Sequence, residues 1–312
     1  MFGRGFTEIR LLGKWFAAAL AVASVACGGD QAAGGPGRID IADAGFMTPE
    51  SVLMDTVADL YLVSNINGSP LDKDDNGFIS RVNPDGTIAE LKWIDGENSN
   101  VTLNAPKGMA IRGDTLFVAD INCVRIFNRV TGEAADGECI EGATFINDLA
   151  VGPEGSVFVT DTGMREGAGG LEPSGTDGVY RYPFQAGRAG ATLAKGPDLG
   201  GPNGVAVSSR GIFVVTFRSG EILRFTAEGE KTQVVQRPGW QLDGIVFTND
   251  GGFLFSNWAD SAVYKVDAGG KLAKLVTGVE TPADIGYDPK RNRVLIPLFN
   301  KNEVVIQDLG GS

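Results

Sequence analysis

A segment that recurs six times constrains the fold of this chain more than any other feature of its sequence. Each copy contains a short hydrophobic run that follows a Pro or an equivalent residue, and successive copies are 57, 40, 56, 40 and 40 residues apart. One equivalent position of the copies, here named the slot, is occupied by Glu50, Lys107, Asn147, Asn203, Asp243 and Ala283. Four of these six side chains offer oxygen donors, so the repeat points to a candidate metal site as well as to an architecture.

Two further segments follow each hydrophobic run, and both have the pattern of half-buried strands. The second segment alternates apolar and polar residues, as in "LYLVSN", "VFVTD" and "FLFSN", and the third does so in "VYRY" and "AVYKV". A unit of about 40 residues with three or four strands is typical of a propeller blade. The sequence therefore predicts an all-β, six-bladed β-propeller over residues 38–312. A two-sheet β-sandwich is the alternative, but sandwiches do not repeat at fixed spacing.

The ring must close, because an open ring would leave sheet edges unpaired. The last repeat stops after its third strand, at about Asp308. The segment "GRIDIA", which ends at Ala42, can supply the missing strand ahead of the first blade. We therefore expect an N-terminal strand to complete the last blade and to bring the two ends of the propeller together.

The first 27 residues differ in kind from the rest. Three basic residues precede an apolar run, 15–26, which is too short to span a bilayer comfortably. The run ends in "ASVAC", which resembles a bacterial lipoprotein processing site with Cys27 as the lipidated residue. We predict an export signal over 1–27, a flexible linker over 28–37 and a cell-envelope protein that meets the membrane only through its lipid. Ser24 stands where Leu is usual, so ordinary cleavage and an uncleaved anchor remain alternatives.

Two other cysteines, Cys123 and Cys139, are predicted on the third and fourth strands of the second blade. Adjacent strands can bring the two thiols together, and an oxidising compartment favours a disulfide between them. The alternative is a pair of small buried hydrophobic residues. Neither interpretation makes these cysteines catalytic.

Composition excludes several classes of partner and of chemistry. The chain has 27 basic and 39 acidic residues and no basic cluster in its predicted folded part, which argues against nucleic acid as a partner. It contains no histidine, which excludes Ser-His-Asp and Cys-His hydrolases and His-ligated zinc sites. A bound metal should then prefer oxygen ligands: calcium first, with magnesium, manganese or zinc as alternatives. We expect the chain to be a monomer.

The slot can be placed in space, because the first strand of each propeller blade lines the central channel. Equivalent positions lie at the same depth, so Glu50, Asn147, Asn203 and Asp243 should form a ring. Two carboxylates and two carboxamides can bind one divalent cation, with water molecules as its remaining ligands. The alternative is that these side chains only form hydrogen bonds with nearby turns.

The motifs around three slot positions are similar to those of the senescence marker protein/gluconolactonase family. They are "FIND" at 145–148, "PNGVAV" at 202–207 and "LDGIVF" at 242–247. The resemblance implies a six-bladed propeller with one divalent metal, held by Glu50, Asn203 and Asp243, and it implies that Asn147 contacts metal or substrate. Phe145 stands where the family often has an Arg that holds a sugar-like substrate, which argues against a sugar lactone.

A metal in this ring would support hydrolysis of a small-molecule lactone or ester. The metal would polarise the carbonyl, and Asp243 would act as the catalytic base. Asp120 and Asp161 close their second strands at the same end of the ring and are candidate substrate-binding residues, as are the equivalent Asn65 and Asn257. Capping of turns is the alternative role for all four.

Two insertions, 66–77 and 162–178, are expected to overhang the metal end and to shape substrate access, with Arg165 as an anion contact. The segment "DKDDNG" within the first insertion resembles the start of a calcium-binding loop. Its closing position holds Asn83 rather than Glu, so a solvated hairpin is favoured over a second calcium site.

Two other functions compete with hydrolysis. A noncatalytic propeller could bind a protein or glycan on its exposed face, since the same architecture hosts enzymes and interaction modules. A cofactor-bearing dehydrogenase is disfavoured, because its usual histidine base is absent.

Overall fold

The structure is a computed structural model that describes residues 37–184 and 189–310. The described residues belong to one compact unit, Gly35–Ser312. The predicted export signal, the lipidation site at Cys27 and the linker up to residue 36 lie outside the described residues. No helix in the described part of the chain is long and apolar enough to cross a membrane.

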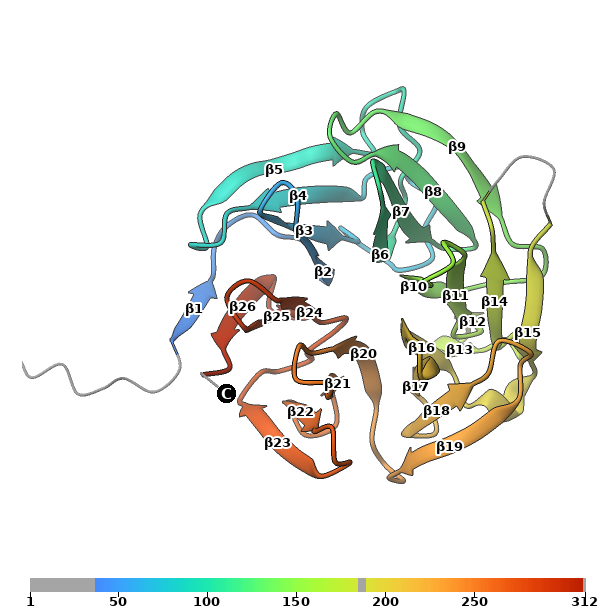
Figure 1. Cartoon of the computed structure of the whole chain (residues 1–312). Helices are drawn as coiled ribbons and strands as arrows, with labels where there is room; N and C mark the ends of the chain where they lie inside the picture. The colour runs from blue at the N-terminus through green and yellow to red at the C-terminus, as the bar shows by residue number, and fades with distance from the viewer. Residues whose placement is uncertain (1–36, 185–188, 311–312) are drawn as a thin grey trace, which may run out of the picture. The chain divides into compact units, whose positions relative to one another are not determined.

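Six four-stranded antiparallel sheets are arranged around a central axis, with the first strand of each sheet innermost (Figure 1). The predicted six-bladed β-propeller is therefore confirmed. Blades 1 to 3 consist of β2 (Pro49–Asp55), β3 (Leu60–Asn65), β4 (Phe78–Val82) and β5 (Ile88–Asp95); β6 (Pro106–Arg112), β7 (Thr115–Asp120), β8 (Cys123–Asn128) and β9 (Ala134–Cys139); and β10 (Ile146–Val151), β11 (Val157–Asp161), β14 (Gly178–Tyr182) and β15 (Ala191–Lys195).

The remaining blades repeat the same order of strands. Blades 4 to 6 consist of β16 (Pro202–Ser208), β17 (Gly211–Thr216), β18 (Glu221–Phe225) and β19 (Lys231–Gln236); β20 (Leu242–Phe247), β21 (Phe253–Asn257), β22 (Ala262–Val266) and β23 (Leu272–Thr277); and β24 (Gly286–Asp288), β25 (Arg293–Leu298), β26 (Glu303–Asp308) and β1 (Arg38–Ile41). One 3-10 turn, η1 (Pro197–Leu199), precedes blade 4.

Hydrophobic side chains from neighbouring blades share each core cluster. Phe117 and Ala119 of blade 2, for example, pack with Leu149 and Val159 of blade 3, and all four are buried. A single blade has no partner for its apolar faces, so the six blades stabilise one another.

The N-terminal strand closes the ring as predicted. β1 pairs antiparallel with β26, with Ile39 opposite Ile306 and Ile41 opposite Val304. The backbone N–H of Asp308 donates to the carbonyl of Gly37 over 2.8 Å, so the two ends of the propeller are adjacent. This pairing covers an edge that would otherwise present unpaired backbone groups.

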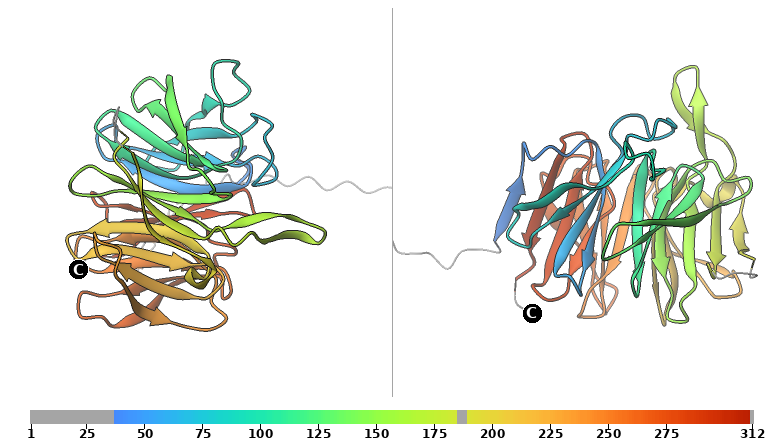
Figure 2. Two further views of the ribbon diagram at one scale, coloured as in Figure 1. Left: turned by 90° about the vertical axis from the view of Figure 1, so that its right-hand side faces the viewer. Right: turned by 90° about the horizontal axis from the view of Figure 1, so that it is seen from above.

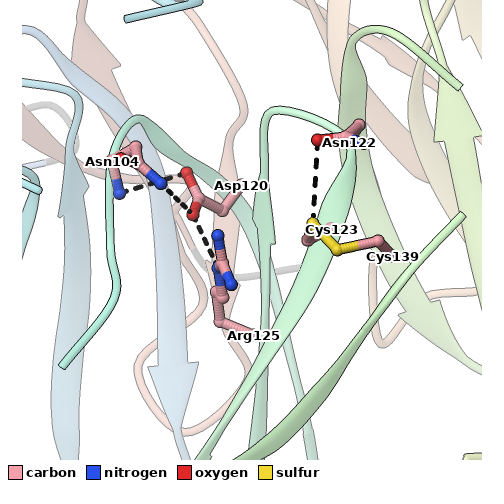
Figure 3. The surroundings of a disulfide bond; sticks show 6 residues. All are labelled: Asn104, Asp120, Asn122, Cys123, Arg125 and Cys139. Carbon is pink, nitrogen blue, oxygen red and sulfur yellow. Dashed lines mark hydrogen bonds and ion pairs between the residues drawn. A yellow bond between two sulfur atoms is a disulfide. The ribbon is translucent and has the colours of Figure 1, made fainter. Parts of the chain in front are cut away.

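Cys123 and Cys139 lie opposite each other on β8 and β9 and form a disulfide (Figure 3). The bond links the outer strand of blade 2, whose residues are all exposed, to the partly buried third strand. It joins strands of one blade and lies away from the central axis.

The second insertion folds into a hairpin of its own. β12 (Met164–Gly167) pairs with β13 (Gly170–Pro173), and the hairpin projects from the ring (Figure 2). Its residues Met164 and Leu171 lie at the end of the channel where the slot side chains also lie.

Candidate functional site

A β-bulge lies at the slot in five of the six blades. The pairing between first and second strands shifts register between Pro49 and Ser51 in blade 1, and the same shift occurs at the slots of blades 2 to 5. The extra residue of a bulge is left out of the ladder, and its side chain takes a new direction. The bulge thus frees Glu50 and its counterparts from the alternation of the strand and lets them face a common space.

In blades 1 and 5, a hydroxyl group on the second strand binds the backbone that the bulge leaves unpaired. Ser64 accepts the N–H of Ser51 (2.9 Å), and Ser256 accepts that of Gly244 (2.8 Å). The Ser256 hydroxyl also donates to the carbonyl of Ala283 in the next blade (2.8 Å). One small side chain therefore fixes the slot of its own blade and that of its neighbour.

The glycine in "PNG" is required by the close approach of the inner strands. A Cβ at Gly204 would lie 2.3 Å from the carbonyl oxygen of Asp243, which no side chain can tolerate. Glycine at this position lets blades 4 and 5 approach each other at the channel. The slot residues Asn203 and Asp243 are thereby held on neighbouring strands.

The structure brings all four predicted metal-site residues together. Glu50, Asn147, Asn203 and Asp243 line a single pocket of about 700 Å³ at one end of the channel. They come from β2, β10, β16 and β20, and each is no more than 5% exposed. The sixth slot residue, Ala283, is also buried but adds no polar atom.

Each of these four side chains keeps one oxygen that is buried and has no hydrogen-bond partner among the described residues. The atoms are Glu50 Oε2, Asn147 Oδ1, Asn203 Oδ1 and Asp243 Oδ1. The Asn147 amide nitrogen donates to Thr162 Oγ1 over 3.0 Å. The amide oxygen of Asn147 is then free to bind a ligand in the pocket. An unsatisfied buried polar atom costs about 1–3 kcal/mol, so four in one pocket indicate a missing partner.

The donor set fits a hard divalent cation. It consists of two carboxylates and two carboxamide oxygens, which are calcium ligands. Within residues 37–184 and 189–310, no three Asp, Glu, His or Cys side chains are grouped to hold a metal by themselves. A cation in this pocket would therefore depend on the carboxamides of Asn147 and Asn203 as well as on the acids.

Electrostatics in the pocket also favour a cation. Burial, followed by the charges of Asp243 and Asp284, raises the pKa of Glu50 well above its usual value. Burial and the charge of Asp284 raise the pKa of Asp243 in the same way. Neighbouring carboxylates in a buried site disfavour one another's ionised form, and a bound cation reverses that preference.

Lys107 occupies the slot of blade 2 and lines the same pocket. Its side chain is 1% exposed, and its ammonium group donates to the carbonyls of Pro70 (3.1 Å) and Ala105 (3.0 Å). The ammonium also lies 4.5 Å from the centre of the Phe145 ring. Burial lowers the pKa of Lys107 to about 8, although the charge of Glu50 acts in the opposite direction.

Sequence reasoning missed two buried acids, Asp148 and Asp284, which directly follow slot positions. Asp148 accepts the N–H of Val205 in the next blade (2.7 Å), and Asp284 accepts the hydroxyl of Ser51 (2.5 Å). Burial raises the pKa of Asp148 well above its usual value and that of Asp284 to about 7. Their position next to the slot, in "FIND" and "TPAD", was the available signal.

Asp120 and Asp161 do not line the pocket, contrary to the prediction that they bind substrate. Asp120 accepts the N–H groups of Asn104 and Ala105 and is paired with Arg125 over 2.7 Å (Figure 3). Asp161 likewise accepts N–H groups from the segment before its slot and is fully buried. Both therefore cap turns, which was the alternative role.

Asn65 and Asn257 have the same capping role. Asn65 accepts the N–H of Met47 (3.0 Å), and Asn257 accepts that of Gln241 (3.0 Å). A residue that closes the second strand faces the blade interior, because successive strand residues point to opposite faces. The residues that line the pocket are instead the next ones along the chain, Ile66 and Trp258.

Both insertions reach the pocket, which is lined by Gly68 and Pro70 from the first and by Met164 and Leu171 from the second. Arg165 does not line it and is instead paired with Glu172 across the exposed hairpin (2.9 Å). In the segment that resembles a calcium loop, Asp74 accepts a hydrogen bond from Asn76 (2.6 Å). The structure thus supports neither an anion contact at Arg165 nor a second calcium site.

Comparisons with known proteins relate the chain to others through its fold. No protein-family model and no curated protein matches its sequence. A gluconolactonase from Xanthomonas campestris is 16% identical, with a TM-score of 0.66 over 88% of this chain and 89% of the other. A structure described as a putative gluconolactonase is also 16% identical, with a TM-score of 0.63 over 88% and 92%.

A second kind of protein shares the fold. Virginiamycin B lyase from Staphylococcus aureus, solved as a catalytically inactive variant with quinupristin, is 12% identical with a TM-score of 0.63 over 88% of this chain and 99% of the lyase. At these identities the likeness extends to the propeller fold alone. It agrees with the resemblance to gluconolactonases that the motifs indicated.

We predict that calcium raises the melting temperature of the protein and that chelation lowers it. Binding only to the folded state stabilises it by about 2.7 kcal/mol at a calcium concentration 100 times Kd. Asp243→Asn should remove most of the calcium-dependent shift. Asp55→Asn is the matched control: this buried acid on β2 is paired with Arg129, so its loss lowers stability but leaves the calcium shift intact. Equal shifts in both variants would contradict the assignment.

We further predict that the metal-free protein loses stability as pH rises from about 4 to about 7. The pKa of Asp284 is about 7 in the folded protein against an ordinary 3.8, so the folded state retains a proton that the unfolded state releases. Asp284→Asn should make the pH dependence of the urea midpoint shallower. Asp288→Asn is the control, because the pKa of Asp288 is lowered and its contribution is lost only as pH falls. An unchanged slope in Asp284→Asn would contradict this prediction.

Proposed function

We propose that this chain is a metal-dependent hydrolase that acts on a lactone or ester at the slot pocket. The observation that carries the proposal is the convergence of four buried, unpartnered oxygens from four blades on one pocket. Glu50, Asn147, Asn203 and Asp243 would hold one divalent cation, with calcium favoured by the all-oxygen donor set. The shared fold of two gluconolactonase structures adds support without identifying a substrate.

A divalent cation bound there would polarise a carbonyl oxygen and make a water more acidic. The protein's own groups would do the rest. Asp243 would take a proton from the attacking water as the new acyl–oxygen bond forms, and it would return that proton to the leaving alkoxide as the old bond breaks. Lys107 is the basic side chain of the pocket lining and would offset part of the acidic charge.

Two other functions have less support than hydrolysis. A lyase reaction like that of the structural neighbour is disfavoured, because a variant of that lyase with one histidine replaced by alanine is catalytically inactive and this chain has no histidine. A noncatalytic propeller that binds a protein or glycan would not need unpartnered acid and amide oxygens in its channel. The activity test below separates it from the hydrolase.

We expect turnover in a panel of lactones and esters assayed with calcium, magnesium, manganese or zinc. Replacement of Asp243 by Ala or Asn should lower kcat/KM by about 100-fold or more, the usual effect of removing a general base. Glu172→Gln is the control, because Glu172 lies on the exposed hairpin and lines no part of the pocket. Equal rates for the wild type and a folded Asp243 variant would refute Asp243 as the base. Absence of any turnover would favour the binding module.

We also propose that the protein is exported to the bacterial cell envelope and anchored by a lipid on Cys27. The support is the basic and apolar pattern of the first 27 residues and the "ASVAC" sequence. Replacement of Cys27 by Ala should move the protein from the membrane fraction to the soluble fraction. Retention in the membrane fraction would favour an uncleaved anchor instead.

A further inference from the structure

A second set of equivalent positions forms the upper wall of the slot pocket. These residues directly follow the second strand of each blade: Ile66, Ile121, Thr162, Phe217, Trp258 and Phe299. All except Ile121 line the pocket. They lie one position beyond the capping residues, so they face the channel whereas the capping residues face the blade.

A shared backbone hydrogen bond fixes this set relative to the slot. In five blades the N–H of the residue after the second strand donates to the carbonyl two positions before the slot, over 2.8–3.1 Å. Ile121 departs from the pattern with a positive φ of 56°. The pocket therefore has two levels, with the polar slot residues below and this second set above.

Three consecutive blades supply aromatic side chains at the upper level. The ring centres of Phe217 and Trp258 are 5.4 Å apart, and those of Trp258 and Phe299 are 5.3 Å apart. All three are half-buried. Together they form a continuous aromatic wall above Asn203, Asp243 and Ala283, which occupy the slots of the same blades.

Several other residues of the lining are also apolar or already bonded within the protein, although Asn300 and Asn302 line it too and Trp258 Nε1 is buried without a hydrogen-bond partner among the described residues. Ile66, Phe145, Met164 and Leu171 extend the apolar surface. The Thr162 hydroxyl donates to the carbonyl of Pro202 over 2.7 Å. Hydroxyl groups of a substrate that lay against the ring faces of Phe217 and Phe299 would lose their water and gain no hydrogen bond from those rings.

Charge disfavours an anionic substrate. Lys107 is the basic residue of the lining, and two of its three donors are used by backbone carbonyls. Glu50 and Asp243 share the pocket, and Asp148 and Asp284 lie next to the slot. With all four acids ionised, the charges of −4 from the acids, +1 from Lys107 and +2 from one divalent cation leave a net charge of −1, so the site is not strongly positive.

We infer that the substrate is a neutral lactone or ester with an apolar substituent. The substituent lies against the aromatic wall of Phe217, Trp258 and Phe299, and the carbonyl faces the slot residues. This inference rests on the proposed hydrolase function and adds the substrate class. It follows from the aromatic side chains at the upper level, none of which is one of the four metal-site residues.

The test compares γ-butyrolactone, γ-hexalactone and γ-decalactone with glucono-δ-lactone in the presence of calcium. Burial of each methylene against a half-buried wall should raise kcat/KM by about threefold for the first few methylenes. Glucono-δ-lactone should be a poorer substrate than γ-decalactone. Phe299→Ala should lower kcat/KM for γ-decalactone by about tenfold more than it lowers that for γ-butyrolactone.

The ratio of kcat/KM for γ-decalactone to that for γ-butyrolactone is the decisive quantity, because it does not depend on the fraction of folded enzyme. Phe299→Leu should preserve most of this ratio, since it retains apolar volume. Phe247→Ala is the matched aromatic control: Phe247 packs on Phe213 away from this pocket. It should leave the ratio at its wild-type value.

Two outcomes separate this inference from the proposed function. Lactone hydrolysis that is insensitive to chain length, or that prefers glucono-δ-lactone, would overturn the inference and retain the hydrolase. If no lactone or ester is hydrolysed, binding of the γ-decalactam, a ring amide that resists hydrolysis, is measured by the fluorescence of Trp258 against Trp258→Phe. Binding would then support an apolar pocket without catalysis, and its absence would overturn the inference too.

Discussion

The β-bulge at the slot is the constraint on which the site depends. A regular strand would direct alternate side chains into the blade and would leave the channel lined by every second residue. The bulge, bound by hydroxyls such as Ser256, releases Glu50, Asn147, Asn203 and Asp243 from that alternation. Because the Ser256 hydroxyl that binds the bulge of blade 5 also contacts blade 6, the site shares contacts with those that hold neighbouring blades together.

Burying several acids close together costs electrostatic free energy, and no contact among the propeller residues that the structure describes offsets this cost fully. Glu50 and Asp243 are buried near further acids, and the pKa of each is raised by burial and by its acidic neighbours. Unpartnered oxygens add to the cost. Sites that store such a cost are often functional, because a ligand that relieves it gains affinity. In the function proposed above, the aromatic wall would limit water near the acids and select the rest of the substrate.

Prediction from sequence succeeded where a pattern repeats and failed where orientation matters. The blade count, the closing strand and the shared pocket of Glu50, Asn147, Asn203 and Asp243 follow from equivalent positions of a repeat. Asp120 and Asp161 were placed in the pocket mouth because they end strands near it, yet both face turns. Phe217, Trp258 and Phe299 went unnoticed, although each is the next residue after such a position.

The sequence by itself determined the number of blades, how the ring closes and which positions are equivalent, because these follow from spacing and hydrophobic alternation. Tertiary structure alone decided which of two adjacent residues faces the channel and which oxygens lack a partner. The physical reason is that a bulge changes the direction of a side chain without changing the hydrophobic pattern. Hydrogen-bond partners such as Thr162 for Asn147 come from other segments of the chain, and no local pattern encodes them.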